Sequence, residues 1–167
     1  MTGETTDMEM KKQQQAQHEH DLRNHFDILS LSRLDRLKHY GLHFAKYAGR
    51  FARGEAEAKS RSETLTDAFL VALSAANALN QPLADVRGTA NDEDPSDLAF
   101  TDQAGRFADA CEKIDHLEEF RTIALHANAA LMEWIVRRAV TEGLDLDALV
   151  EERRRQLARR PVHAPEG

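Results

Sequence analysis

The chain has 167 residues, with 22 Lys and Arg against 29 Asp and Glu and a formal net charge of −7. Hydrophobic residues make up 41% of the chain and aromatic residues 6%, so Leu and Ala must supply most of the core, as is typical of helical proteins. The net negative charge argues against nucleic acid as the main partner, and the single Cys excludes an internal disulfide or a cysteine-cluster metal site. No apolar run is suited to a membrane span or a signal peptide. The sequence therefore predicts a cytoplasmic protein without membrane contact.

The N-terminal residues 1–25 are polar and rich in Gln and His. They have almost nothing to bury, so we expect a flexible segment or a frayed helical lead-in that carries no chemistry. Residues 26–160 are expected to form a single all-α domain, and residues 161–167 a tail.

A first helical hairpin is predicted over residues 27–80. Apolar residues recur at steps of three and four from 27 to 53, which indicates an amphipathic helix ending near Gly54. Ser60 and Glu63 have the spacing of a capping box, and the helix that follows, from Thr64 to Leu79, is apolar around most of its circumference. Such a helix is expected to be buried.

A polar linker over residues 81–104 separates this hairpin from a second one over residues 105–143. Thr101 or Asp102 would cap its first helix, which is predicted to run to about Phe120, and its second helix would stop at Gly143. A short C-terminal helix is predicted over 145–160. The expected fold is an all-α bundle of four principal helices in two hairpins, plus this short helix.

Carboxylates are densest near the end of the third predicted helix. Glu112, Asp115 and Glu119 stand at i, i+3 and i+7, so they should project from one helical face with His116 beside them. Three such carboxylates can share a hard divalent cation such as Mg2+. The face lies opposite the apolar side of the helix, however, and this favours a solvated polar surface.

Asp67 is unusual because it stands near the start of a helix that is otherwise apolar, with Leu70, Val71 and Ser74 on its own face. A partly buried carboxylate needs a partner, and Glu63 lies one turn earlier. The alternative is an acidic residue that is favoured there by the helix dipole alone.

A basic stripe runs along the first long helix, where His39, His43, Lys46 and Arg50 share one face. His43, Lys46 and Arg50 could contact a phosphate, and the two His residues could bind a transition metal. A solvated face, or an ion-pair seam with the acidic stripe, is the interpretation that the pattern favours. The arginines between 153 and 160 are likewise expected to face solvent.

Three stretches resemble the MazG-like branch of the all-α NTP pyrophosphatase superfamily. ETLTDAFLVALSAANALNQPL is similar to the family helix that opens with an E-x-x-D motif, with Asp67 on the motif Asp and Thr64 in the place of the Glu. CEKIDHLEEF resembles the E-x-x-E motif through Glu112 and Asp115, and GLDLDALVEERRRQLARRPV resembles the closing segment. The two motifs stand in reversed order, which a degenerate tandem of two hairpins would explain.

The resemblance implies hydrolysis of a nucleoside triphosphate to the monophosphate and pyrophosphate with Mg2+ or Mn2+, or nucleotide binding by a relative that has lost catalysis. Glu112, Asp115 and Asp67 would be the catalytic acids, and His43, Lys46 and Arg50 would steady the phosphates. The metal ligands would be Glu112, Asp115, Glu119, Asp67 and Glu63.

Two other classes of function stay open. The first is a non-catalytic helical interaction or scaffold protein that oligomerises, and a homo-oligomer, as a dimer, is expected in either case. The second is a ferritin-like or hemerythrin-like metal bundle. It would be built from His39, His43, Glu112, His116 and Glu119.

Overall fold

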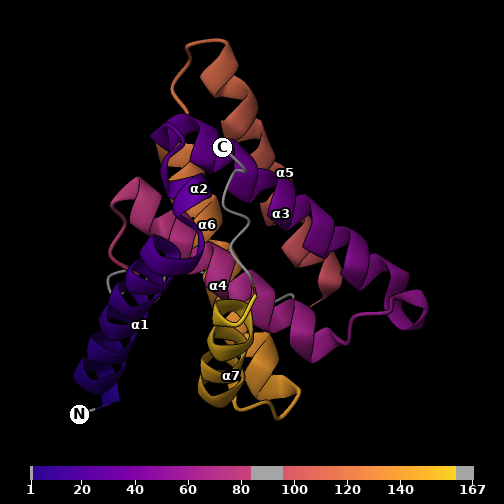
Figure 1. Cartoon of the computed structure of the whole chain (residues 1–167). Coiled ribbons are helices and arrows are strands. Elements are labelled where there is room, and N and C mark those ends of the chain that lie inside the picture. Colours follow the sequence, from indigo (N-terminus) through magenta and orange to yellow (C-terminus); the bar gives the residue numbers. More distant parts are fainter. Residues whose placement is uncertain (1, 84–95, 161–167) are drawn as a thin grey trace.

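The computed structural model describes residues 2–83 and 96–160, which form helices joined by short turns. This architecture confirms the predicted all-α fold class with two long hairpins and a short C-terminal helix (Figure 1). The elements in chain order are α1 (Thr2–Asn24), α2 (Phe26–Leu29), α3 (Arg33–Arg53), a single 3-10 turn (Gly54–Ala56), α4 (Arg61–Leu79), α5 (Asp97–Asp115), α6 (Arg121–Thr141) and α7 (Leu146–Ala158).

The four long helices α3 to α6 form the bundle. Helix α3 packs against α4 and α5, and α6 packs against the same two helices, so the order around the bundle is α3, α4, α6, α5. Aromatic rings fill the seam between α3 and α5, where Phe44 meets Phe107 edge to face with ring centroids 5.0 Å apart. Phe51 meets Phe100 in the same way at 5.1 Å.

Helix α4 is the most enclosed element of the fold. It contacts α3 and α6 inside the bundle, and α1 and α7 cover its outer side (Figure 1). The helix is buried along most of its length, which confirms the expectation from its apolar circumference. The capping box is confirmed as well, because the Ser60 hydroxyl accepts a hydrogen bond from the backbone N–H of Glu63 while the Glu63 carboxylate accepts one from the Ser60 N–H.

The predicted ends of several other helices also agree with the structure. Helix α4 ends at Asn80, which adopts the left-handed conformation of a C-cap with φ 51°. Gly143, with φ 67°, lies just beyond the end of α6. Asp145 caps α7 by accepting a hydrogen bond from the N–H of Ala148.

The N-terminal segment is a docked helix, where the sequence predicts a flexible segment or a frayed helical lead-in. Thr2–Asn24 is helical, and Gln17, His20 and Asp21 are buried. Polar side chains make the contacts that hold α1 against the rest of the fold. The Gln14 amide donates to the carbonyl of Gln81 at 2.8 Å, and the Arg154 guanidinium donates to Gln17 at 3.0 Å. Apolar periodicity could not detect a helix that is held by amide and guanidinium hydrogen bonds.

The second hairpin also departs from the predicted boundaries. Helix α5 begins at Asp97, so the predicted linker 81–104 is too long at its C-terminal end, and residues 84–95 lie outside the described residues. Phe100 and Ala104 are buried and continue the apolar face that starts the helix early. Helix α5 ends at Asp115 rather than near Phe120, and the turn that follows contains Leu117 with φ 57°.

Across the two described ranges, each helix falls short of the length or the apolar character that crossing a membrane requires.

The capping box offers a direct test of why α4 begins where it does. Ser60→Ala removes the side-chain acceptor for the Glu63 N–H and should lower the free energy of unfolding by about 1 kcal/mol. Ser62→Ala is the control, because it removes the hydroxyl that lies 3.1 Å from Ser60 Oγ and leaves both capping hydrogen bonds in place. Urea denaturation measures both variants. Equal losses of stability would contradict a specific role for the cap.

Candidate functional site

A cavity of about 390 Å³ opens between α3 and α4. One wall is the face of α4 that carries Asp67, Leu70, Val71 and Ser74, which the sequence places at i, i+3, i+4 and i+7. The rest of the lining comes from α1, from α2 with His25 just before it, and from α7 and the residues beside it. The volume falls within the range of about 300–1,000 Å³ that small-molecule sites occupy.

The facing wall is the basic stripe of α3. His39, His43, Lys46 and Arg50 all line the cavity, and the stripe faces α4 and not the acidic residues of α5. Lys59, Arg153 and Arg160 add further positive charge from outside α3. Five Lys and Arg side chains therefore face two carboxylates, those of Asp21 and Asp67, within this lining. Such a surplus of cations favours an anionic ligand.

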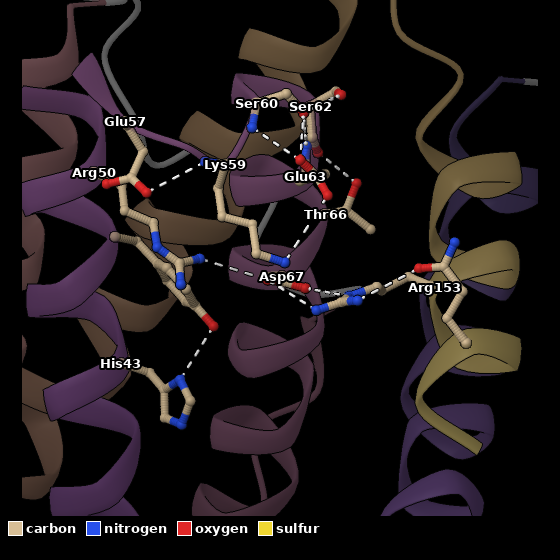
Figure 2. A network of polar contacts seen from close by, with 12 residues as sticks. His43, Arg50, Glu57, Lys59, Ser60, Ser62, Glu63, Thr66, Asp67 and Arg153 are labelled. Carbon is tan, nitrogen blue, oxygen red and sulfur yellow. Dashed lines mark hydrogen bonds and ion pairs between the residues drawn. The ribbon is translucent and has the colours of Figure 1, made fainter. Parts of the chain in front are cut away.

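Asp67 lies between two guanidinium groups, as Figure 2 shows. Arg153 Nε donates to Asp67 Oδ1 at 2.7 Å, and Arg50 Nη1 lies 3.6 Å from Oδ2. The three side chains are only 13% to 16% exposed. The partner that a buried carboxylate requires is therefore supplied by arginine.

Arg50 keeps donor capacity after this pairing. The distance of 3.6 Å from its Nη1 to Asp67 is too long for a hydrogen bond, and this buried atom has no hydrogen-bond partner within the part of the chain that the structure describes. A buried donor without a hydrogen bond is costly, and among the described residues this atom has the ion pair with Asp67 as its contact. The Tyr47 ring supports the cations, with Lys46 Nζ 5.2 Å and Arg50 Cζ 5.5 Å from its centroid.

A chain of polar rings continues along α3 from this cationic end. The Tyr47 hydroxyl and His43 Nδ1 are 3.1 Å apart, and His43 Nε2 and His39 Nε2 are also 3.1 Å apart. Burial, followed by the neighbouring cations, lowers the pKa of His43 to about 4. Burial also lowers the pKa of His39. At neutral pH the His43 ring is therefore uncharged and can donate from one nitrogen and accept at the other.

The N-terminal region contributes residues that the sequence interpretation missed. Gln17 and Asp21 of α1 and His25 line the cavity. Asp21 is buried, accepting a hydrogen bond from the Ser74 hydroxyl at 2.6 Å and one from the Gln17 amide at 2.9 Å. Burial raises the pKa of the Asp21 carboxyl, and these two hydrogen bonds act in the opposite direction. The sequence offered only a weak indication of this site, namely that Asp21 follows Gln17 by four residues and so lies on the same side of a helix.

The predicted acidic stripe lies elsewhere and is not a single helical stripe. Glu112 and Asp115 belong to α5, whereas Glu119 lies in the following turn and accepts a hydrogen bond from the N–H of Thr122 at the start of α6. Glu112 pairs with His116 at 2.8 Å, with both side chains about 60% exposed. Asp115 pairs with Lys38 of α3. Helix α5 ends too early for the i, i+3, i+7 spacing to hold.

The structure does not bring these acids together with Asp67. Gly41 of α3 faces Cys111 of α5, and Arg50, which meets Asp67, stands nine residues later and so on the opposite side of α3. Lys38 and Arg50 are also about 18 Å apart along the axis, from 12 residues at 1.5 Å each. Glu63 is occupied in the capping box and turns toward Ser60 (Figure 2).

The residues expected to form a ferritin-like or hemerythrin-like metal site are also separated from one another in the structure. His39 and His43 line the cavity, while Glu112 and His116 form an exposed pair near the end of α5. Over residues 2–83 and 96–160, no group of three or more His, Cys, Asp or Glu side chains is arranged to hold a metal ion.

The arginines of the C-terminal helix divide between two environments. Arg153 and Arg160 line the cavity, and Arg154 donates to Gln13 and Gln17 of α1, contrary to the expectation that this cluster faces solvent. Arg155 pairs with acidic residues of its own helix.

Comparison with protein-family models, curated proteins and solved structures finds no match to this chain.

The buried imidazoles make stability depend on pH. The pKa of His43 is about 4 in the folded protein against 6.5 for an unperturbed imidazole, so the unfolded chain takes up its proton first as pH falls. The melting temperature should therefore decrease between about pH 6.5 and pH 4. His20, whose pKa is also lowered to about 4, contributes in the same direction.

Replacing His43 separates its share of this effect. His43→Gln should give a shallower decrease of melting temperature with falling pH than the wild type. His116→Gln is the control, since it replaces an exposed imidazole that lies outside the cavity lining. A His43→Gln profile as steep as that of the wild type would contradict the assignment.

Proposed function

We propose that the protein binds a phosphate monoester that carries an apolar or planar group, a nucleotide being the natural example, in the cavity between α3 and α4. The observation that carries the proposal is the grouping of three cations, Lys46, Arg50 and Arg153, at one end of the cavity. Guanidinium and ammonium groups are the side chains that bind phosphate most strongly.

The middle of the cavity supports the second half of this ligand. Leu70 and Val71 stand between Asp67 and Ser74 on the wall of α4, and Ile28 and Leu29 of α2 also line the cavity. Aliphatic walls next to a cationic end suit a molecule with one charged and one apolar part. Inorganic phosphate alone would leave these walls unused.

The geometry favours binding without a divalent cation. Lys46, Arg50 and Arg153 already bring positive charge to the place where the phosphate would lie, and Asp67 is engaged by two arginines. A metal-dependent pyrophosphohydrolase needs several carboxylates at its phosphate site. Glu112, Asp115 and Glu119 lie on the other side of α3, so hydrolysis with Mg2+ stays a prediction that the following experiments separate from binding.

Charge-removing variants test the phosphate contact. Calorimetric titration with AMP in EDTA should show binding by the wild type, and Lys46→Gln or Arg50→Gln should each weaken it about tenfold or more, because a charge-assisted hydrogen bond is worth about 1.5–3 kcal/mol. Arg106→Gln is the matched control, since it removes one positive charge from an exposed position on α5. It should bind AMP as the wild type does.

Two results would overturn the proposal. One is the absence of binding by AMP, ADP and ATP, which the helical interaction protein predicts. The other is binding that appears only with Mg2+ and is followed by release of pyrophosphate from ATP, which the MazG-like resemblance predicts.

The variant Asp67→Asn tests whether Asp67 serves as the ion-pair partner of two arginines or as a metal ligand. Removing the carboxylate charge leaves Arg50 and Arg153 without their anion, so the free protein should melt at a lower temperature. The same change releases both guanidiniums for the ligand, so AMP should bind more tightly. Glu63→Gln removes one charge a turn earlier, outside the cavity lining, and should alter AMP affinity little. Weaker AMP binding by Asp67→Asn would indicate a ligand role for Asp67 instead.

A further inference from the structure

The cavity has a second polar end, which is built around Asp21. This carboxylate lines the cavity and is 6% exposed. It is fixed in place by the Ser74 hydroxyl at 2.6 Å and by the Gln17 amide at 2.9 Å, one donor to each oxygen. Both donors are neutral, and among the described residues no cation forms an ion pair with Asp21, although the Arg154 guanidinium interacts with its charge.

The Asp21 end and the cationic end lie at opposite ends of the α4 wall. Asp67, which meets Arg50 and Arg153, and Ser74, which meets Asp21, are seven residues apart on one face of α4. Seven residues of helix span about 10 Å. This is on the scale of a nucleoside monophosphate measured from its phosphate to the far edge of its base.

The two carboxylates of the lining differ in what they can still accept. Asp67 is engaged by two guanidiniums, whereas Asp21 receives a single neutral hydrogen bond at each oxygen. An ionised carboxylate offers about four lone-pair sites, so Asp21 keeps acceptor capacity after these two hydrogen bonds. A ligand atom placed there gains most if it is an N–H donor.

We propose that Asp21 selects the ligand by accepting a hydrogen bond from an amino group on its base, so that the site prefers nucleotides with an exocyclic amine, such as AMP. This inference rests on the proposed function. The phosphate would lie against Lys46, Arg50 and Arg153, the ring between the aliphatic walls, and the amine against Asp21. The separation of Asp67 and Ser74 along α4 and the opposite chemistry of the two ends of the cavity support this orientation.

The experiment compares AMP with purine riboside 5′-monophosphate, which differs from it by replacement of the amine with hydrogen. Wild-type protein should bind AMP about tenfold to a hundredfold more tightly, the range expected for a hydrogen bond to a charged group. Asp21→Ala should bring the ratio of the two affinities close to one while both nucleotides still bind. Glu19→Ala is the control, because it removes an exposed carboxylate from the same helix, outside the cavity lining, and should keep the preference.

Equal affinities of the wild type for the two nucleotides would overturn the inference, and so would a preference that persists in Asp21→Ala. The wild-type comparison alone decides the matter if Asp21→Ala does not fold. Failure of this inference is distinguishable from failure of the proposed function: when both nucleotides bind equally only the role of Asp21 is lost, and when neither binds the phosphate site itself is lost.

Discussion

The fold depends on the need to bury α4 on all sides. Because Thr64–Leu79 is apolar around its circumference, a bundle in which α4 contacted only α3 and α6 would leave a wide apolar face in water. Helices α1 and α7 cover that face, and they do so largely through polar contacts at their edges, such as those of Gln14 and Arg154. Where this cover is incomplete, between α3 and α4, the cavity opens.

The same constraint explains the charge of the cavity. An aliphatic helix surface cannot face water at low cost, but the facing stripe of α3 is polar and cationic, so the space between them has one apolar and one basic wall. Asp67 is the charged residue on the α4 wall, and the arginines that meet it come from two elements far apart in the sequence, α3 and α7. The ion pairs of Asp67 with Arg50 and Arg153 therefore connect α7 to the bundle at the edge of the candidate site.

Local patterns in the sequence were sufficient for the fold. Periodicity, the capping box at Ser60 and the glycine after α6 each report on neighbouring residues, and the structure confirms them. The Gln-rich α1 was missed because its buried face is polar, and its partners, such as Ser74 and Arg154, are more than 50 residues away. The stripe of Glu112, Asp115 and Glu119 failed because a left-handed residue, Leu117, ends the helix inside it. For the site, the sequence indicated two stripes, the one around Asp67 and the one from His39 to Arg50, but only tertiary packing shows that they face each other.

The central claim is that phosphate is bound by side-chain cations in the cavity and not by carboxylates around a metal on α5. The most direct measurement is a map of backbone amide chemical shifts during titration with AMP in EDTA. The account predicts that the largest changes fall on Lys46, Arg50 and the turn of α7 that carries Arg153, on the side of α3 that lines the cavity. Changes confined to the stretch from Glu112 to Glu119, or no changes at saturating AMP, would contradict it.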